Sequence, residues 1–206
     1  MIGRISDAKY NELNINKIDG IKIYNNFLSE EEQDYLVYII DNLEWDKRYN
    51  NLCQYYGFTN THNFERLVKP VEITNPIPED LNIGKKIGLD FNQLHIEEFK
   101  ERKGKHPFKE SSSFHEHVLF LPLYSDVVIY FKDNDKEDEE DNTSSKIPIY
   151  IKRGTLVVLS GDARFKYYRG ITYKKTYSFN YRNLKRDRLI LMTFRNIKKS
   201  KFEHLI

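Results

Sequence analysis

The chain has 206 residues, of which 39% are hydrophobic and 31% charged, and its formal net charge is +2. This length is typical of a single domain, which we expect to span residues 1–206 without disulfides or structural metals. Cys53 is the only cysteine, which excludes an intramolecular disulfide and a cysteine-rich zinc site. Because no apolar run is long enough to cross a membrane and no signal-peptide pattern is present, we expect a cytoplasmic protein with no membrane contact.

The charges are unevenly distributed along the chain. Residues 164–201 contain 13 Lys or Arg and a single acid, Asp187. Residues 133–141 contain seven acids and a single Lys. We expect residues 133–145 to form an acidic surface loop, and the basic region to face a charged partner.

The first third of the chain predicts a strand and a helix. Residues 1–20 show no clear pattern and are predicted to be an irregular lead-in, followed by a short strand at residues 21–24. Ser29 and Glu32 have the spacing of a capping box, in which each satisfies a free backbone N–H of the other at the start of a helix. Apolar residues then recur at helical spacing up to residue 43.

The later part of the chain predicts strands. A second short helix is predicted at residues 79–89, after a loop that contains Pro76 and Pro78. Short apolar runs separated by turn residues then predict strands at 118–123, 127–131, 147–151, 155–159 and 189–194. Helices followed by strands indicate an α+β domain built on an antiparallel sheet or barrel.

Six segments, in the right order, resemble the AlkB group of iron- and 2-oxoglutarate-dependent oxygenases. They are residues 27–45, 54–58, 76–78, 91–93, 160–171 and 192–195, the last with the sequence Met-Thr-Phe-Arg. The resemblance implies a double-stranded β-helix, or jelly roll, with flanking N-terminal helices. It also implies a ferrous iron held by two His and one carboxylate, with 2-oxoglutarate beside it.

The residues at the implied iron site are not metal ligands. The family's His-x-Asp motif falls on residues 106–108 or 107–109, so that His106 is the only candidate His and Phe108 or Lys109 replaces the carboxylate. The family's second His corresponds to Arg169, whose guanidinium has no lone pair to offer a metal.

The cosubstrate positions are also altered. The family's Asn-x-Tyr corresponds to Glu97 and Phe99, where Glu97 would repel a dianion and Phe99 lacks a hydroxyl. The distal carboxylate of 2-oxoglutarate pairs with an Arg six residues before the final Arg195 of the motif, but that position is Leu189. Arg188 is one residue away and would face the other side of a strand. We therefore predict no catalytic residue, metal or cofactor.

One rearranged metal site remains an alternative. His115 and His117 form a His-x-His pair on one face of a predicted strand, with Glu110 nearby. Two surface histidines at the start of a strand are the commoner arrangement. For Cys53 we expect a buried structural thiol.

The region from Arg164 to Arg186 alternates basic and aromatic residues. Cations neutralise phosphates and aromatic rings stack on unpaired bases, as binding to looped or single-stranded RNA requires. The alternative is that the aromatics belong to the core and the cations to a solvated face. The predicted RNA-binding residues are Lys166, Tyr167, Arg169, Tyr173, Lys174, Lys175, Arg182, Lys185 and Arg186.

Three hypotheses follow. The first is a catalytically inactive AlkB-like module that binds structured RNA or a ribonucleoprotein, above all the ribosome, in a translation or dormancy role. The second is an active, divergent oxygenase that demethylates nucleic acid, with His106, His115 or His117 as ligands. The third is a protein-interaction scaffold that uses residues 49–66 and the acidic loop.

Overall fold

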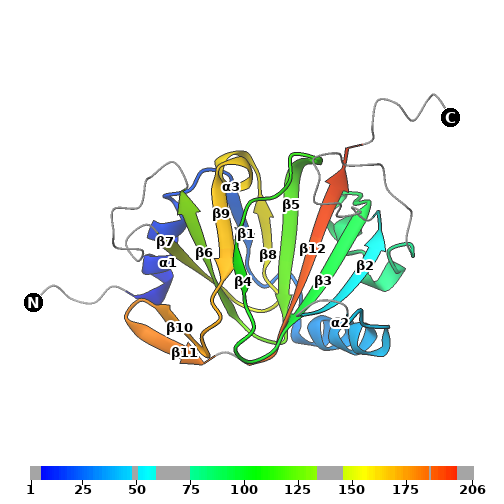
Figure 1. Ribbon diagram of the computed structural model, residues 1–206, viewed down its shortest axis with the longest axis horizontal. Helices are drawn as coiled ribbons and strands as arrows, with labels where there is room; N and C mark the ends of the chain where they lie inside the picture. Colours follow the sequence, from blue (N-terminus) through cyan, green and yellow to red (C-terminus); the bar gives the residue numbers. More distant parts are fainter. Residues whose placement is uncertain (1–5, 48–50, 59–74, 134–145, 186, 199–206) are drawn as a thin grey trace, which may run out of the picture.

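Two antiparallel sheets face each other in the structure, a computed structural model that describes residues 6–47, 51–58, 75–133, 146–185 and 187–198 (Figure 1). The larger sheet has the order β1 (Ile21–Tyr24), β8 (Leu156–Leu159), β5 (Phe114–Leu123), β12 (Leu189–Ile197), β3 (Gln93–Phe99) and β2 (Leu52–Gly57). The smaller sheet has the order β4 (Lys105–Phe108), β9 (Tyr167–Ile171), β6 (Val127–Asp133) and β7 (Lys146–Ile151). β10 (Thr176–Phe179) and β11 (Arg182–Lys185) form a separate hairpin. The predicted jelly-roll is confirmed.

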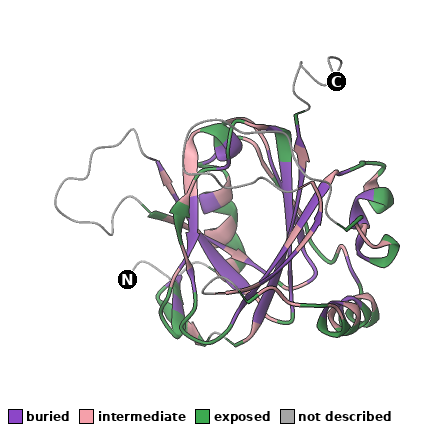
Figure 2. Ribbon diagram, turned by 45° about the vertical axis from the view of Figure 1, so that its right-hand side comes forward, coloured by how far each residue is buried: buried purple, intermediate pink, exposed green. Residues whose placement is uncertain are grey.

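The larger sheet separates two hydrophobic cores, because alternate side chains on its strands point to opposite faces. On β12, Leu191 packs between the two sheets with Phe120 and Phe131. Its neighbour Met192 packs on the outer face, where Ile40 of the helix α2 (Glu30–Asn42) covers the sheet. Figure 2 shows the buried strands running between the exposed faces of the helices.

The predicted start of α2 is confirmed by its hydrogen bonds. The Ser29 Oγ accepts from the backbone N–H of Glu32 at 3.2 Å, and the Glu32 carboxylate accepts from the backbone N–H of Ser29 at 2.9 Å. Leu36 and Ile40 are buried, as the helical spacing predicts. The predicted helix at 79–89 is instead two 3₁₀ turns, Glu79–Leu81 and Ile83–Ile87.

The irregular lead-in predicted for residues 1–20 is wrong where the structure describes it, because Asp7–Ile15 forms the helix α1. The amide of Asn11 bonds both the N–H and the carbonyl of Tyr150 at 2.8 Å, and Asn14 donates to the Pro148 carbonyl. These bonds cover the free edge of β7, a position that would otherwise expose unpaired backbone groups. Since polar amides anchor much of this helix, its sequence lacks a strong apolar period.

A short third helix, α3 (Gly161–Phe165), follows β8 and was not predicted. The loop between β6 and β7, residues 134–145, lies outside the described residues, so the predicted acidic loop is described only at Asp133. That residue ends β6 and is buried.

Replacing Gly20 with Ala should destabilise the fold by about 2 kcal/mol or more beyond the same change at Gly88. Both glycines have φ in the left-handed region, +88° and +67°. A Cβ at Gly20 would lie 2.0 Å from the Ser160 carbonyl oxygen, whereas one at Gly88 would meet nothing within 4 Å. Urea unfolding of the two variants measures the difference, and equal midpoints would contradict the close contact between Gly20 and Ser160.

Candidate functional site

Charged side chains gather inside the barrel, where most jelly-roll interiors are apolar. Glu97, Glu110, Arg164, Arg169 and Arg195 are each no more than 7% exposed. They come from β3, the β4–β5 loop, α3, β9 and β12, so elements distant in sequence converge on one point. Buried charges of this kind need partners, because an unpaired ion in a protein interior is costly.

Glu110 is the centre of this cluster. Its carboxylate accepts two hydrogen bonds from Arg195, with Nε to Oε2 at 2.8 Å and Nη2 to Oε1 at 2.9 Å. The same Oε1 also accepts from Nη2 of Arg169. Burial alone would raise the pKa of the Glu110 carboxyl, but the two guanidinium groups hold it well below its usual range. Glu110 is therefore a carboxylate occupied on both oxygens.

Arg164 fixes the loop that carries Glu110. Its guanidinium donates to the backbone carbonyl of Glu110 at 3.0 Å and to that of Ser111. The side chain is 1% exposed and comes from α3, the helix that follows β8. This contact makes Arg164 a positioning residue for the Glu110 carboxylate.

A second ion pair lies beside the first. The Lys105 ammonium donates to Oε2 of Glu97, and the Nδ1 of His95 lies 3.8 Å from the same oxygen. Burial would raise the pKa of the Glu97 carboxyl, but Lys105 and His95 together lower it to about 2. Burial lowers the pKa of His95 to about 4, so its imidazole is neutral near pH 7.

The space left between these groups is very small. A cavity of about 10 Å³ is lined by Glu97, Lys105, Phe108, Arg169, Leu191 and neighbouring residues. One water molecule needs roughly this volume, and an organic diacid needs far more. Among the described residues, side chains therefore leave space for about one water molecule at this point.

These residues do not fit a ferrous iron with 2-oxoglutarate. A metal ion at Glu110 would have to displace two guanidinium groups, and Arg169 supplies no lone pair. Arg195, the final Arg of the family's motif, donates two hydrogen bonds to Glu110. At the other cosubstrate positions, Leu189 and Phe99 are fully buried and pair across β12 and β3.

The structure separates the two residues on either side of Pro107. Phe108 pairs with Arg169 across β4 and β9, and the guanidinium lies 4.8 Å from its ring centre. His106 is exposed and its ring contacts Tyr173. His106 is therefore not brought to the Glu110 cluster.

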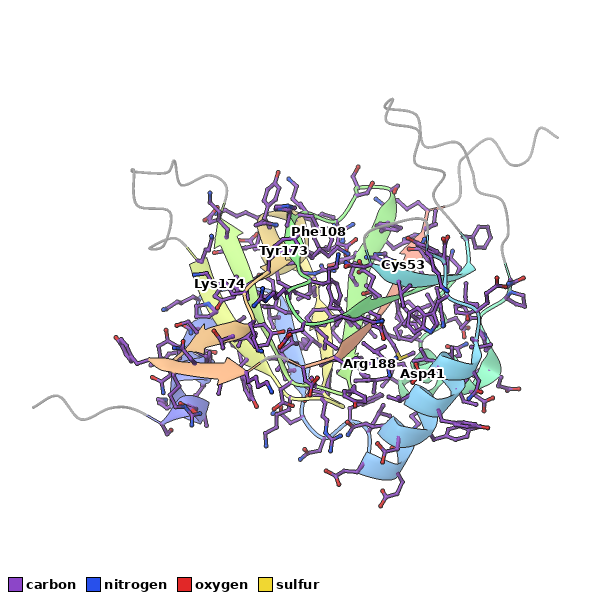
Figure 3. The ribbon with its side chains drawn as sticks, turned by 60° about the horizontal axis from the view of Figure 1, so that its bottom comes forward. Asp41, Cys53, Phe108, Tyr173, Lys174 and Arg188 are labelled. Carbon is purple, nitrogen blue, oxygen red and sulfur yellow. The ribbon has the colours of Figure 1, made fainter. Side chains whose placement is uncertain are left out.

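Arg188 lies on the outer face of the sheet, away from the barrel interior. It bonds Asp41 of α2 at 2.8 Å and Glu98 at 2.6 Å, and Figure 3 shows Arg188 and Asp41 side by side. This placement follows from the strand alternation that buries Leu189 inside. His115 and His117 are exposed at the start of β5, and the structure groups no third metal ligand with them among the described residues.

Sequence reasoning missed the importance of Glu110. Counting back from the β5 strand placed Phe108 or Lys109 at the carboxylate position, but the structure places the carboxylate of Glu110 against Arg169 instead. The reason is the loop of five residues between Phe108 and Phe114, which lets the chain turn back into the barrel after β4. The segment Phe108-Lys109-Glu110 contained the signal for this position. It places a carboxylate two residues after an aromatic ring, which is the His-x-Asp spacing with Phe in place of His.

The predicted RNA-binding residues differ in their exposure and in their ion pairs. Arg169 is buried, Lys166 pairs with Asp133, and Arg182 pairs with Asp7. Tyr167 is half-buried, and Arg186 lies outside the described residues. The remaining residues, Tyr173, Lys174, Lys175 and Lys185, are exposed.

The loop between β3 and β4, residues 100–104, lies next to those exposed residues. The sequence analysis did not consider this loop. Gly104 packs so tightly on this segment that a Cβ would come within 2.5 Å of the Ile171 carbonyl oxygen. Lys175 bonds Glu101 at 2.6 Å, and Lys185 pairs with Thr176 across the hairpin. We call the resulting patch the basic end surface, which consists of Lys100, Arg102, Lys103, Lys174, Lys175 and Lys185. In Figure 3, Tyr173 and Lys174 lie on the side of the barrel opposite Cys53.

Cys53 is buried on β2, as predicted, and burial raises the pKa of its thiol to about 11. None of the described helices is long and apolar enough to cross a membrane.

Sequence comparisons find relatives that match most of this chain. No family model matches the chain. An uncharacterised protein of Acanthamoeba polyphaga mimivirus is 27% identical over 198 residues, which cover 91% of this chain and 89% of that protein. The tRNA (carboxymethyluridine(34)-5-O)-methyltransferase alkbh8 of Xenopus tropicalis is 23% identical over 171 residues, or 76% of this chain and only 26% of the relative.

Solved structures point the same way. OsALKBH1 has a TM-score of 0.61 at 13% identity and covers 86% of this chain and 98% of its own. A 2OG-Fe(II) oxygenase-family oxidoreductase from Burkholderia pseudomallei has a TM-score of 0.54 at 9% identity, covering 95% and 91%. HygX from Streptomyces hygroscopicus, solved with nickel and 2-oxoglutarate, has a TM-score of 0.52 at 8% identity. The match covers 89% of this chain and 85% of HygX. The chain thus has the fold of these oxygenases, and the AlkB resemblance is confirmed at that level.

Replacing Glu110 with Gln should lower the free energy of unfolding at neutral pH by about 3–5 kcal/mol, because two buried guanidinium groups lose their counter-charge. The native pKa lies below the ordinary value of 4.5, so this stabilisation is complete above that pH and is lost as the pH falls toward the native pKa. In urea unfolding, the difference in the free energy of unfolding between wild type and variant should decrease by roughly 1.4 kcal/mol per pH unit in acid.

The exposed Glu116 on β5 offers a matched control. Glu116→Gln should change stability by less than about 0.5 kcal/mol. If the difference in unfolding free energy between wild type and Glu110→Gln stays constant between neutral and acid pH, the Glu110 charge does not hold the cluster together.

Proposed function

We propose that this chain is a catalytically inactive AlkB-like module that binds structured RNA or a ribonucleoprotein such as the ribosome. One observation carries the inactive part of the proposal: both oxygens of Glu110 are engaged by Arg169 and Arg195 inside the barrel. A carboxylate that accepts three hydrogen bonds from two cations is a poor ligand for a metal cation, and the small cavity beside it leaves no room for a diacid.

The positions of these residues match the family's motif in a third register. If the first His of the motif corresponds to Phe108, its carboxylate corresponds to Glu110 and its second His to Arg169. We propose this register in place of those at 106–108 and 107–109, and the contacts of Arg169 with Phe108 and Glu110 support it. The carboxylate is then retained as Glu, and Arg169 neutralises it where a metal would.

The basic end surface supports the RNA part of the proposal. It contains six cations, of which Lys175 pairs with Glu101 and Lys100 with Glu98, and the exposed ring of Tyr173 lies in the same segment. Phosphates pair with such cations, and unpaired bases stack on such rings, as in looped RNA. Two loops distant in sequence build this surface, so it is a feature of the fold and not of one basic stretch.

The second support is the Xenopus relative, whose name gives tRNA as its substrate. The matched segment is about a quarter of that protein, and it is the part that shares sequence with this chain. Arg169 no longer belongs to the proposed contact, because its guanidinium is buried against Glu110.

Replacing Lys174, Lys175 and Lys185 with Ala should weaken binding to purified ribosomes and to a looped RNA hairpin, and should flatten the dependence on salt. If the three lysines make about three phosphate contacts, the wild-type affinity should fall roughly tenfold or more between 50 and 200 mM salt. Electrophoretic mobility shift and ribosome co-sedimentation across that range measure both quantities.

The control replaces three exposed lysines on other elements, Lys22, Lys47 and Lys85. The two triple variants lose the same charge, so a general effect of net charge would weaken both equally. Equal salt slopes for the wild type and the Lys174/Lys175/Lys185 variant would contradict the proposal and favour the protein-scaffold hypothesis.

A further inference from the structure

The pairing of β2 with β3 brings three metal-binding side chains onto one face. Cys53 lies directly opposite Glu97 in the register of the two strands. His95 is two residues before Glu97 on β3, so its side chain points to the same face. This juxtaposition is set by the backbone register.

The ligand atoms of these three residues are already close together. One atom each from Cys53, His95 and Glu97 lies within 4.8 Å of the others, and no other such group occurs in the described part of the chain. The Nε2 of His95 is buried and has no hydrogen-bond partner, although a buried imidazole nitrogen is normally bonded. The nitrogen that lies 3.8 Å from the Glu97 carboxylate is Nδ1, so the imidazole has one nitrogen near the carboxylate and a second, unsatisfied one to offer a ligand.

We propose that Cys53, His95 and Glu97 bind a zinc ion, with water in the fourth position. A tetrahedral zinc holds S, N and O ligand atoms roughly 3.4–3.6 Å apart, so movements of about an ångström suffice. A half-turn of the His95 ring, which stacks on Tyr55 at 4.4 Å, exchanges its two nitrogens without breaking that contact. A thiolate favours zinc over magnesium or calcium.

The charge at this site suits a divalent cation. The Cys53 thiolate and the Glu97 carboxylate would together neutralise zinc, so the neighbouring Arg195 faces no net added charge. Lys105 now pairs with Glu97, but its side chain is 24% exposed and can move towards solvent when zinc replaces it. Binding therefore exchanges one cation for another and releases the thiol proton.

This site adjoins the Glu110 cluster inside the barrel but uses other residues as ligands. Its ligands come from β2 and β3, whereas Phe108, Glu110 and Arg169 come from β4, the loop after it and β9. It also lies on the side of the barrel away from Tyr173 and Lys174 (Figure 3). Zinc binding and RNA binding can therefore be tested independently.

The full-length protein, stripped of metal by a chelator and titrated with Zn²⁺ against a chromophoric competitor, should bind one equivalent in the micromolar range or tighter. With Co²⁺ alone it should develop a thiolate-to-cobalt charge-transfer absorption, because Cys53 is the only cysteine. Cys53→Ser should abolish that absorption, and both Cys53→Ser and His95→Asn should weaken zinc binding at least tenfold.

The control is the double variant His115→Asn/His117→Asn, which removes the exposed histidine pair on β5 and should bind zinc as the wild type does. Two results would overturn the proposal: no charge-transfer absorption in the wild type, or zinc affinity that is lost in the β5 variant and kept in Cys53→Ser. The cobalt spectrum of the wild type decides the question even if a variant fails to fold.

Discussion

The Glu110 carboxylate is the shared counter-charge of two buried guanidinium groups, and much of the barrel interior is arranged around it. Arg195 binds it from β12, Arg169 from β9, and Arg164 holds its loop in place from α3. Loss of one partner of a buried ion pair commonly costs about 3–5 kcal/mol, so these residues constrain one another. Each oxygen of Glu110 accepts from a guanidinium group, and this geometry supports the proposal that the chain holds no iron centre at Glu110.

The proposed RNA contact uses residues on the exterior of the barrel. The basic end surface, built from the β3–β4 loop and the segment after β9, is where exposed cations and an exposed ring occur together. Some cations that look equivalent in sequence are held in ion pairs: Arg182 pairs with Asp7, and Lys166 pairs with Asp133. Cations held in ion pairs contribute little to phosphate binding, and Lys175 of the basic end surface itself pairs with Glu101. Lys174 and Lys185 should therefore dominate the salt dependence.

The sequence predicted the elements whose signals are local. The Ser29 capping box and the alternation that sends Leu189 inward and Arg188 outward could be read because they depend on neighbouring residues. The helix α1 escaped prediction because amide bonds to a strand edge, made by Asn11, replace part of the usual apolar face. Glu110 was misjudged for a similar reason: its partners lie 59 and 85 residues away, and only the folded chain brings them together.

Iron-dependent conversion of 2-oxoglutarate to succinate is the most direct test of the central claim, that an internal ion-pair cluster has replaced the catalytic centre. The wild-type protein, incubated anaerobically with ferrous iron and 2-oxoglutarate and then exposed to oxygen, should form no succinate above a protein-free control. It should also show no 2-oxoglutarate binding by calorimetry at micromolar concentrations. Iron-dependent succinate formation by the wild-type protein would contradict the account.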